Sequence, residues 1–458
     1  MSAPTGAAVR AVPGGRRGRA RVVASAVLGI VGTGSPPARL RLAGLVMTLV
    51  TVLFGAVLAV SVHERQTAAR NLAEQSAPLS ADAAEIYRSL ADADATAAAG
   101  FLRGVKASHA DRVSYEANIR TASRLLTKAS ARTGESFAAQ RQIAILNKEL
   151  PDYNGLVEAA RSANRENKPV GNSYMRYASE QMRSTMLPAA EDMYHAETRR
   201  MAAIRADTAE PPWATYGAGL LALAVIGFYS YRLYLATNRL LNLGLVAAAA
   251  AVLVSLVWLT VSHTTTRSSL EDSEARGSAS VQVLTQARIA GLKARGNENM
   301  ALVARGEGAA HSREFDYWAG AMDDKDKGQR LMQRSEQQAE DKIGRRLVVD
   351  AWAELKDWKK QHVQARKQDD RGDYEAAVAR TIGGKADGKT VSDTTERSFA
   401  AMDRKLAAAV AHEWKQFQDR AENGRGALTG LPVGGSVLCL LGVAGVVLGV
   451  GKRLSEYQ

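Results

Sequence analysis

Two sets of polar residues occupy corresponding positions in the two halves of the chain. Each set has an arginine, a histidine and a tyrosine in that order: Arg103, His109 and Tyr115, then Arg305, His311 and Tyr317. An arginine can hold a carboxylate through two parallel hydrogen bonds, and His and Tyr can complete a polar pocket around it. We predict these six as candidate ligand-binding residues. The simpler alternative is that they shape the first helix–helix turn of each half.

Other patterns that suggest chemistry lack the surroundings that the chemistry needs. Gly383 to Thr390 fits the phosphate-binding pattern G-x-x-x-x-G-K-T, but helix-forming residues precede it and no parallel sheet is expected. His412 begins a stretch like the zinc-protease motif H-E-x-x-H, but Gln416 replaces the second histidine. No Ser or Cys forms a triad pattern with a histidine. We therefore expect no metal, no cofactor and no enzymatic activity.

Four apolar segments must position any such site. Each has about 20 residues, enough for a helix to cross a hydrocarbon core of about 30 Å. These predicted transmembrane helices are residues 42–62, 213–236, 240–262 and 428–450. They leave two large polar segments, 63–212 and 263–427, and three short pieces, 1–41, 237–239 and 451–458.

The net charge of +13 is concentrated beside the predicted spans. Residues 1–41 contain seven Arg and no acid, whereas each large polar segment is within two charges of neutral. Short basic segments flanking spans remain in the cytoplasm. We therefore expect cytoplasmic N- and C-termini, extracytoplasmic polar segments and residues 20–32 lying along the inner leaflet. A nucleic-acid-binding face is not expected, because no large segment is basic.

Both polar segments are rich in helix-forming residues, and neither has the alternation typical of strands. In the first segment, Ser80 or Asp82 is expected to cap a helix through Phe101, and Pro151 to kink or divide a later one. Further helices are predicted over 109–131, 136–166, 174–208, 264–305, 309–340, 342–371 and 392–422, with a Gly-rich loop at 383–388. The predicted fold is an all-α membrane protein with four transmembrane helices and two extracytoplasmic helical bundles.

The two halves show a weak internal repeat in a consistent order. His63 and His263 are 200 residues apart, the Arg, His and Tyr sets 202 apart, and Tyr153 pairs with Trp358 at 205. Small insertions would explain the slow growth of this offset. We therefore predict two homologous bundles in tandem, each between two spans.

Each half resembles the sensor hairpin of bacterial chemoreceptors, in which a helical bundle lies between two spans. The stretch from Met186 to Glu191, Met-Leu-Pro-Ala-Ala-Glu, fits such bundle sensors. No HAMP, kinase or methyl-accepting domain follows either half, so a separate protein is expected to receive the signal. The whole layout is similar to actinobacterial four-span membrane sensors of the GlnX type. That resemblance implies outer domains that receive an amino-acid-binding lipoprotein and a relay to a soluble Ser/Thr protein kinase.

These observations predict a non-catalytic signalling receptor embedded in the lipid bilayer of the cell membrane. It would sense an extracytoplasmic small molecule, for instance an amino acid such as glutamate, or a ligand-loaded binding protein. The residues predicted to couple to a cytoplasmic partner are Arg16, Arg17, Arg232 and Arg239. The alternative is a structural or envelope-organising scaffold.

Overall fold

The described residues divide into two compact units. The computed structural model describes residues 36–104, 109–134, 136–237, 242–272, 279–304, 308–323, 330–386, 388–428 and 431–454. One unit, here the membrane unit, comprises Met1–Glu64, Pro212–Ser262 and Gly430–Gln458. The other, here the polar unit, comprises Arg65–Pro211 and His263–Thr429. The predicted turn 237–239 and both predicted tails lie largely outside the described residues, as do Arg16, Arg17 and Arg239.

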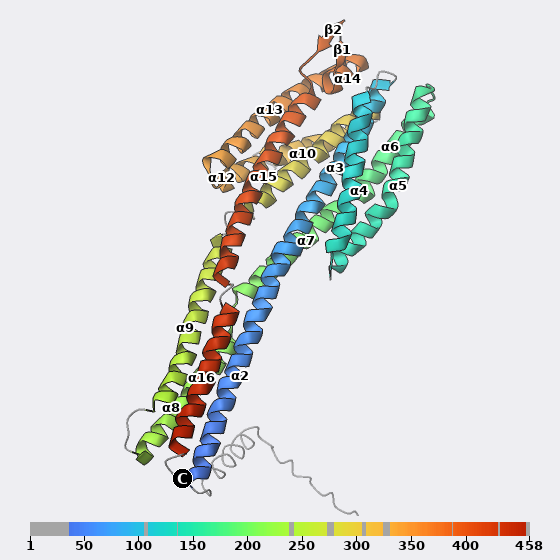
Figure 1. The fold of residues 1–458 in the computed structure, drawn as a ribbon. Helices are drawn as coiled ribbons and strands as arrows, with labels where there is room; N and C mark the ends of the chain where they lie inside the picture. Colours follow the sequence, from blue (N-terminus) through green and yellow to red (C-terminus); the bar gives the residue numbers. More distant parts are fainter. Residues whose placement is uncertain are drawn as a thin grey trace, which may run out of the picture. The chain divides into compact units, whose positions relative to one another are not determined.

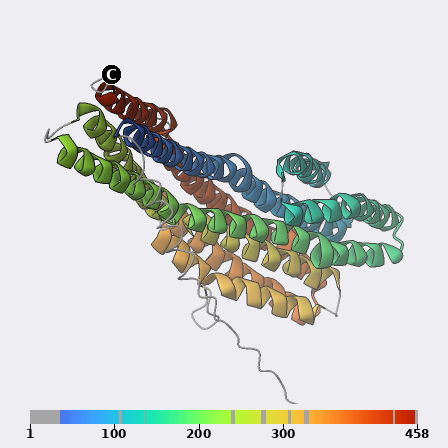
Figure 2. The same cartoon turned by 90° about the horizontal axis from the view of Figure 1, so that it is seen from below.

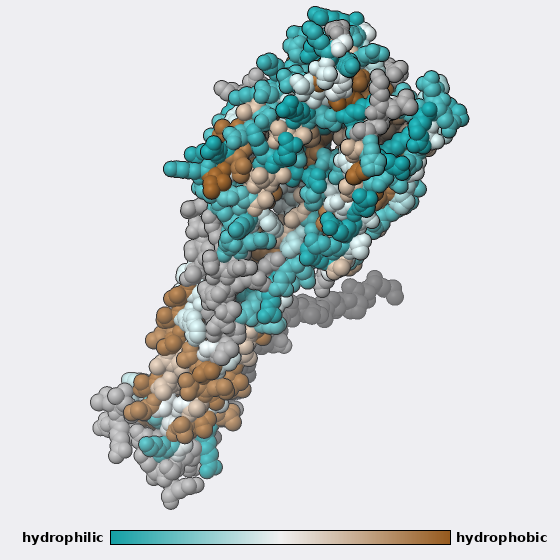
Figure 3. Space-filling view, turned by 45° about the horizontal axis from the view of Figure 1, so that its top comes forward, coloured by the Kyte–Doolittle hydropathy of each residue, from teal (hydrophilic) through white to brown (hydrophobic). Residues whose placement is uncertain are grey.

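Four long apolar helices make up the membrane unit. They are α2 (Pro36–Asn71), α8 (Trp213–Thr237), α9 (Leu243–Asp272) and α16 (Leu431–Leu454). Each contains a stretch long and apolar enough to span a membrane: Arg41–Ala68, Trp213–Leu235, Leu243–Thr264 and Gly434–Lys452. The four predicted spans are thereby confirmed as candidate membrane helices. Large apolar side chains such as Leu45, Leu220 and Leu440 remain more than half exposed, as lipid-facing residues do. Figure 3 shows these apolar surfaces in brown and the hydrophilic surface of the polar unit in teal.

The first polar segment is entirely helical in its described residues. Its elements are α3 (Ala77–Arg103), α4 (His109–Arg132), α5 (Phe137–Arg165), α6 (Val170–Gln181) and α7 (Leu187–Ala209), with π turns η1 (Leu72–Ser76) and η3 (Met182–Met186). The second and third predicted helices, 109–131 and 136–166, agree with α4 and α5 to within about one residue. The fourth, 174–208, corresponds to α6, η3 and α7.

The expected helix start at Ser80 or Asp82 is wrong, because helix continues from α2 through η1 into α3. Asp82 instead accepts bonds from Lys128 and Arg132 of α4. Each π turn lies directly before a Leu-Pro or Ala-Pro pair, so that Pro78 and Pro188 fall in the first turn of α3 and α7. A proline has no N–H and its ring clashes with the carbonyl four residues back, and a wider turn relieves both effects.

Pro151 does not divide α5, which runs unbroken from Phe137 to Arg165. We expect Pro151→Ala to stabilise the polar unit by about 1–3 kcal/mol, because it restores an interior N–H and removes the ring clash. Thermal unfolding of the full chain in lipid nanodiscs, followed by tryptophan fluorescence, measures this. Replacing the neighbouring exposed Asp152 with Ala is the control. An unchanged or lower melting temperature for Pro151→Ala would contradict the prediction.

The second polar segment combines helices with one small hairpin. Its helices are α10 (Ala279–Val303), α11 (Ala309–Asp323), α12 (Leu331–Gln338), α13 (Lys342–Asp370), α14 (Tyr374–Ile382) and α15 (Thr395–Leu428). These yellow to red helices lie together in both views (Figures 1 and 2). The predicted Gly-rich loop is instead an antiparallel hairpin of β1 (Gly384–Ala386) and β2 (Lys389–Val391), in which Lys385 pairs with Thr390. Positive φ angles at Gly383 and Gly388 permit these bends. The G-x-x-x-x-G-K-T pattern therefore lies on a hairpin and not between a strand and a helix.

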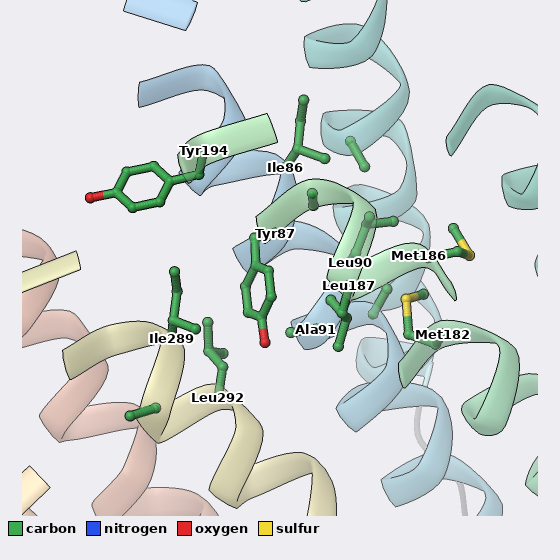
Figure 4. Close-up of a cluster of buried hydrophobic side chains, with 14 of the residues drawn as sticks. Ile86, Tyr87, Leu90, Ala91, Met182, Met186, Leu187, Tyr194, Ile289 and Leu292 are labelled. Atoms are coloured by element: carbon green, nitrogen blue, oxygen red, sulfur yellow. The ribbon is translucent and has the colours of Figure 1, made fainter. Parts of the chain in front are cut away.

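The two polar segments share one hydrophobic core. The sequence predicted one bundle per segment, whereas buried residues of both segments belong to a single apolar cluster. Figure 4 shows Tyr87 and Leu90 of α3 with Tyr194 of α7 and with Ile289 and Leu292 of α10. The reason is that α3 and α10, the first helices of the two segments, pack against each other. A site in the polar unit can therefore be built from both halves.

Candidate functional site

The predicted residue Arg103 connects the two segments. It lies at the end of α3, and its guanidinium donates to Asp111 at 2.6 Å, to Glu396 of α15 at 2.7 Å and to the Ile382 carbonyl at 2.6 Å. Two carboxylates thus neutralise this arginine. Its geometry is that of an intersegment brace.

Of the other five predicted binding residues, the structure describes four, and the bonds of Arg103 go to none of these four. His109 is exposed at the start of α4, while Tyr115 is buried and donates to Asn154 at 2.9 Å. His311 contacts Arg183 and Asn297, and Tyr317 is half exposed. Arg305 lies outside the described residues. Among the predicted coupling residues, the structure describes Arg232, which is exposed on α8 with its guanidinium 5.5 Å from the Phe228 ring centre.

Two buried carboxylates lie on α3 and α10, the first helices of the two polar segments. Asp94 accepts bonds from Tyr153 at 3.2 Å and from Ser179 at 2.8 Å. Glu298 accepts a bond from Trp358 at 3.1 Å and pairs with Arg295. Trp358 is the residue that the predicted repeat pairs with Tyr153. Burial raises the pKa of Asp94. Burial acts in the same direction on Glu298, but Arg295 and His362 outweigh it and lower the pKa of that carboxyl.

A cavity of about 640 Å³ lies between α3, α7, α10 and α15. Its walls are mainly apolar and include Ala84, Met201, Leu292 and Phe417. Tyr194 and Ile289, also in the wall, project from facing helices in Figure 4. Because both segments contribute, a molecule held here would contact the first helix of each half.

Two arginines and their carboxylates form the charged wall of this cavity. Arg88 of α3 bonds to Glu85 at 2.6–2.9 Å and to Asp92 at 2.6 Å. Arg288 of α10 bonds through Nε and Nη2 to both carboxylate oxygens of Asp403, at 2.9 and 3.0 Å. Arg88 and Arg288 are 200 residues apart, the same offset as His63 and His263. The sequence interpretation missed these two functional candidates; their offset is a signal in the sequence, but it does not show that both side chains line one cavity.

The carboxyl group of Asp92, which bonds to Arg88, is expected to make the unfolding free energy depend on pH between about pH 4 and pH 6. Burial, with a smaller contribution from Asp403, raises the pKa of Asp92 to about 6 against the opposing effect of Arg88. Over this range the unfolded chain loses the Asp92 proton while the folded chain keeps it, so folding stability falls as pH rises. We expect the wild type to lose about 2 kcal/mol of unfolding free energy relative to Asp92→Asn over this range.

This difference is measured by unfolding both proteins in nanodiscs at pH 4, 5, 6 and 7. Subtracting the Asp92→Asn curve cancels the titration of the other carboxylates. Parallel curves would show that Asp92 titrates normally and would contradict the prediction.

The four candidate membrane helices are consistent with a multi-pass membrane protein. Residues 68–206 match the family model described as an actinobacterial sensor domain. The match covers α3 to almost the end of α7, and thus one side of the cavity. This part of the chain is therefore similar to an actinobacterial sensor domain, which suggests a sensor role. No curated protein and no solved structure is significantly similar to the chain.

Proposed function

We propose that the protein is a non-catalytic transmembrane receptor whose polar unit binds a small molecule and relays this event to a separate cytoplasmic protein. One observation carries the proposal: the segment that matches a sensor domain forms part of a cavity of about 640 Å³, within the usual range for ligand pockets. The other part of the wall comes from α10 and α15 of the second segment. Binding at this place can therefore change how the two segments pack.

The helices around the cavity suggest how a signal would travel. The chain passes from α2 through the π turn η1 into α3 without leaving helix, and α15 ends three residues before α16 begins. A ligand that favours one packing of α3 against α10 and α15 would bias the positions of helices that continue toward the spans. A π turn within such a helix is a frequent feature of functional sites.

The partners follow from the family resemblance and from the charge pattern. We propose two partners: on the extracytoplasmic side a binding lipoprotein loaded with an amino acid such as glutamate, and in the cytoplasm a Ser/Thr protein kinase. Arg232 and Arg239, with Arg16 and Arg17, would contact that cytoplasmic protein. The second candidate function is a scaffold, which the shared hydrophobic core of the two segments favours because it joins both segments in one packed unit.

A crosslinking experiment separates receptor from scaffold. A photo-crosslinking amino acid replaces Arg232 in the full chain, expressed in its native membranes. The test variant Ala407→Trp fills the cavity, and Ala138→Trp on the exposed face of α5 is the matched control.

If the protein is a receptor, we expect a kinase to be captured at position 232. Ala407→Trp should change the captured amount at least about threefold, and Ala138→Trp should leave it unchanged. A change of about threefold corresponds to a shift in equilibrium of less than 1 kcal/mol. If no cytoplasmic protein is captured, or if capture is equal in all three proteins, the receptor proposal fails and the scaffold is supported.

A further inference from the structure

We propose that the cavity binds a single-chain anionic amphiphile, a molecule with a long apolar body and one carboxylate or phosphate head. This inference rests on the proposed function and names the ligand class of the same site. Its basis is the length of the cavity, the nature of its two ends and the charge of its polar wall.

The cavity is long and narrow. Its lining on α15 extends from Asp403 to Phe417, which corresponds to about 20 Å along a helix axis at 1.5 Å per residue. Its lining on α10, from Ala279 to Leu292, has nearly the same length. A volume of about 640 Å³ spread over this length gives a mean cross-section of about 30 Å². Such a shape suits one extended chain better than a compact ring system or a small amino acid.

One end of the cavity is apolar and aromatic. Trp414 and Phe417 stack with ring centres 5.4 Å apart, and Met201 packs with Phe417 in a small buried cluster. All three line the cavity. Arg205 also lies at this end, with its guanidinium carbon 5.8 Å from the Phe417 ring centre. A hydrocarbon chain gains by leaving water against the aromatic rings and Met201.

The other end carries the charged wall. Arg288 uses two of the five guanidinium N–H donors for Asp403, so its Nη1 group can serve an additional acceptor. Three lining arginines stand at this end, Arg88, Arg288 and Arg404, with the carboxylates Glu85 and Asp403, and Arg88 also bonds to Asp92. Arginine binds carboxylate and phosphate oxygens with well-directed bonds, so the Nη1 group of Arg288 is the donor that an anionic head would use.

The test uses hexadecanoate that carries a photoreactive diazirine, with the full chain in nanodiscs of zwitterionic lipid. After irradiation, labelled peptides are mapped by mass spectrometry. We expect adducts on the cavity-lining parts of α3, α10 and α15. Unlabelled hexadecanoate should compete, whereas hexadecanol, which has no charge, and glutamate, which has no chain, should not. Competition by a lysophosphatidate in a separate arm tells whether a membrane-derived phosphate lipid or a free fatty acid binds better.

Two substitutions that each remove one charge should change the amount of labelling in opposite directions. Arg288→Gln should reduce labelling about tenfold, because it removes a charge-assisted bond to the head. Asp403→Asn should increase labelling at least about threefold, because the carboxylate no longer competes for Arg288. Arg345→Gln, on the exposed face of α13, is the control. Misfolding would lower labelling in both variants, so the opposite signs identify the head site.

The outcomes separate this inference from the proposed function. Absence of cavity adducts, or a decrease in both variants, overturns the amphiphile. If glutamate instead protects the cavity from labelling, the amphiphile is overturned while the receptor stands. If labelling follows the expected pattern but hexadecanoate does not alter capture at position 232, the ligand is established and the receptor proposal fails.

Discussion

Replacing Glu298 with alanine is expected to destabilise the polar unit by about 3–5 kcal/mol. Glu298 is almost fully buried in α10 and accepts bonds from Trp358, from His362 at 2.8 Å and from Arg295 at 2.5 Å. Without it, Arg295, which is only 3% exposed, keeps its charge with Thr395 as its remaining bonded partner. The indole N–H of Trp358 also loses its acceptor, and an unsatisfied buried donor costs a further about 1–3 kcal/mol if no water reaches it.

The control variants isolate the buried charge as the cause. Removing both partners with Arg295→Met and Glu298→Leu should recover the part of the loss that comes from the uncompensated charge, while the cost of the Trp358 N–H without its acceptor remains. Glu354→Ala, which breaks the partly exposed pair with Lys405, should cost less than about 1 kcal/mol. Denaturant unfolding of the four proteins in nanodiscs gives these free energies. A loss for Glu298→Ala no larger than that for Glu354→Ala would disprove the account.

Much of the helical architecture could be predicted because its signals are local. Length and apolar composition identified all four candidate spans, and helix-forming composition identified α4, α5 and α13 closely. The errors concern helix boundaries predicted from single residues. Ser80 and Asp82 are good capping residues, yet the helix continues past both. Proline did not end α5 either. Tertiary packing of the apolar faces overrides such preferences of one residue.

The site could not be found by matching residue types alone. Arg103, His109 and Tyr115 match Arg305, His311 and Tyr317 in type, but Tyr115 is buried and Tyr317 half exposed. A repeat in sequence fixes corresponding positions along helices; it does not fix which faces meet when the two halves share a core. Arg88 and Arg288 became candidates only because α3 packs on α10 and both side chains line one cavity. Tyr153 and Trp358, which the sequence comparison also paired, do have similar surroundings. Each donates a hydrogen bond to a buried carboxylate on the first helix of its own half.

Gly244→Val is expected to separate two helices of the membrane unit. A Cβ atom at Gly244 of α9 would lie 2.4 Å from the Gly445 carbonyl oxygen and 2.6 Å from the Gly449 Cα of α16. These neighbours are backbone atoms, which cannot rotate away as a side chain can. Asn242 strengthens the same contact by donating to the Gly449 carbonyl at 2.8 Å. Close approach of small residues is a main source of helix association in membranes, and we expect the substitution to cost at least about 3 kcal/mol.

A disulfide reports this contact directly. Ala251 of α9 and Gly442 of α16 would bring their Cβ atoms to 3.6 Å, within the range that a disulfide needs. In a Cys439→Ala background, Ala251→Cys with Gly442→Cys should therefore crosslink efficiently, and adding Gly244→Val should reduce the yield at least about fivefold. Gly227→Val in α8, where a Cβ meets nothing within 4 Å, should leave the yield unchanged. Equal yields with both valines would show that α9 and α16 remain in contact despite Gly244→Val, and would contradict the prediction.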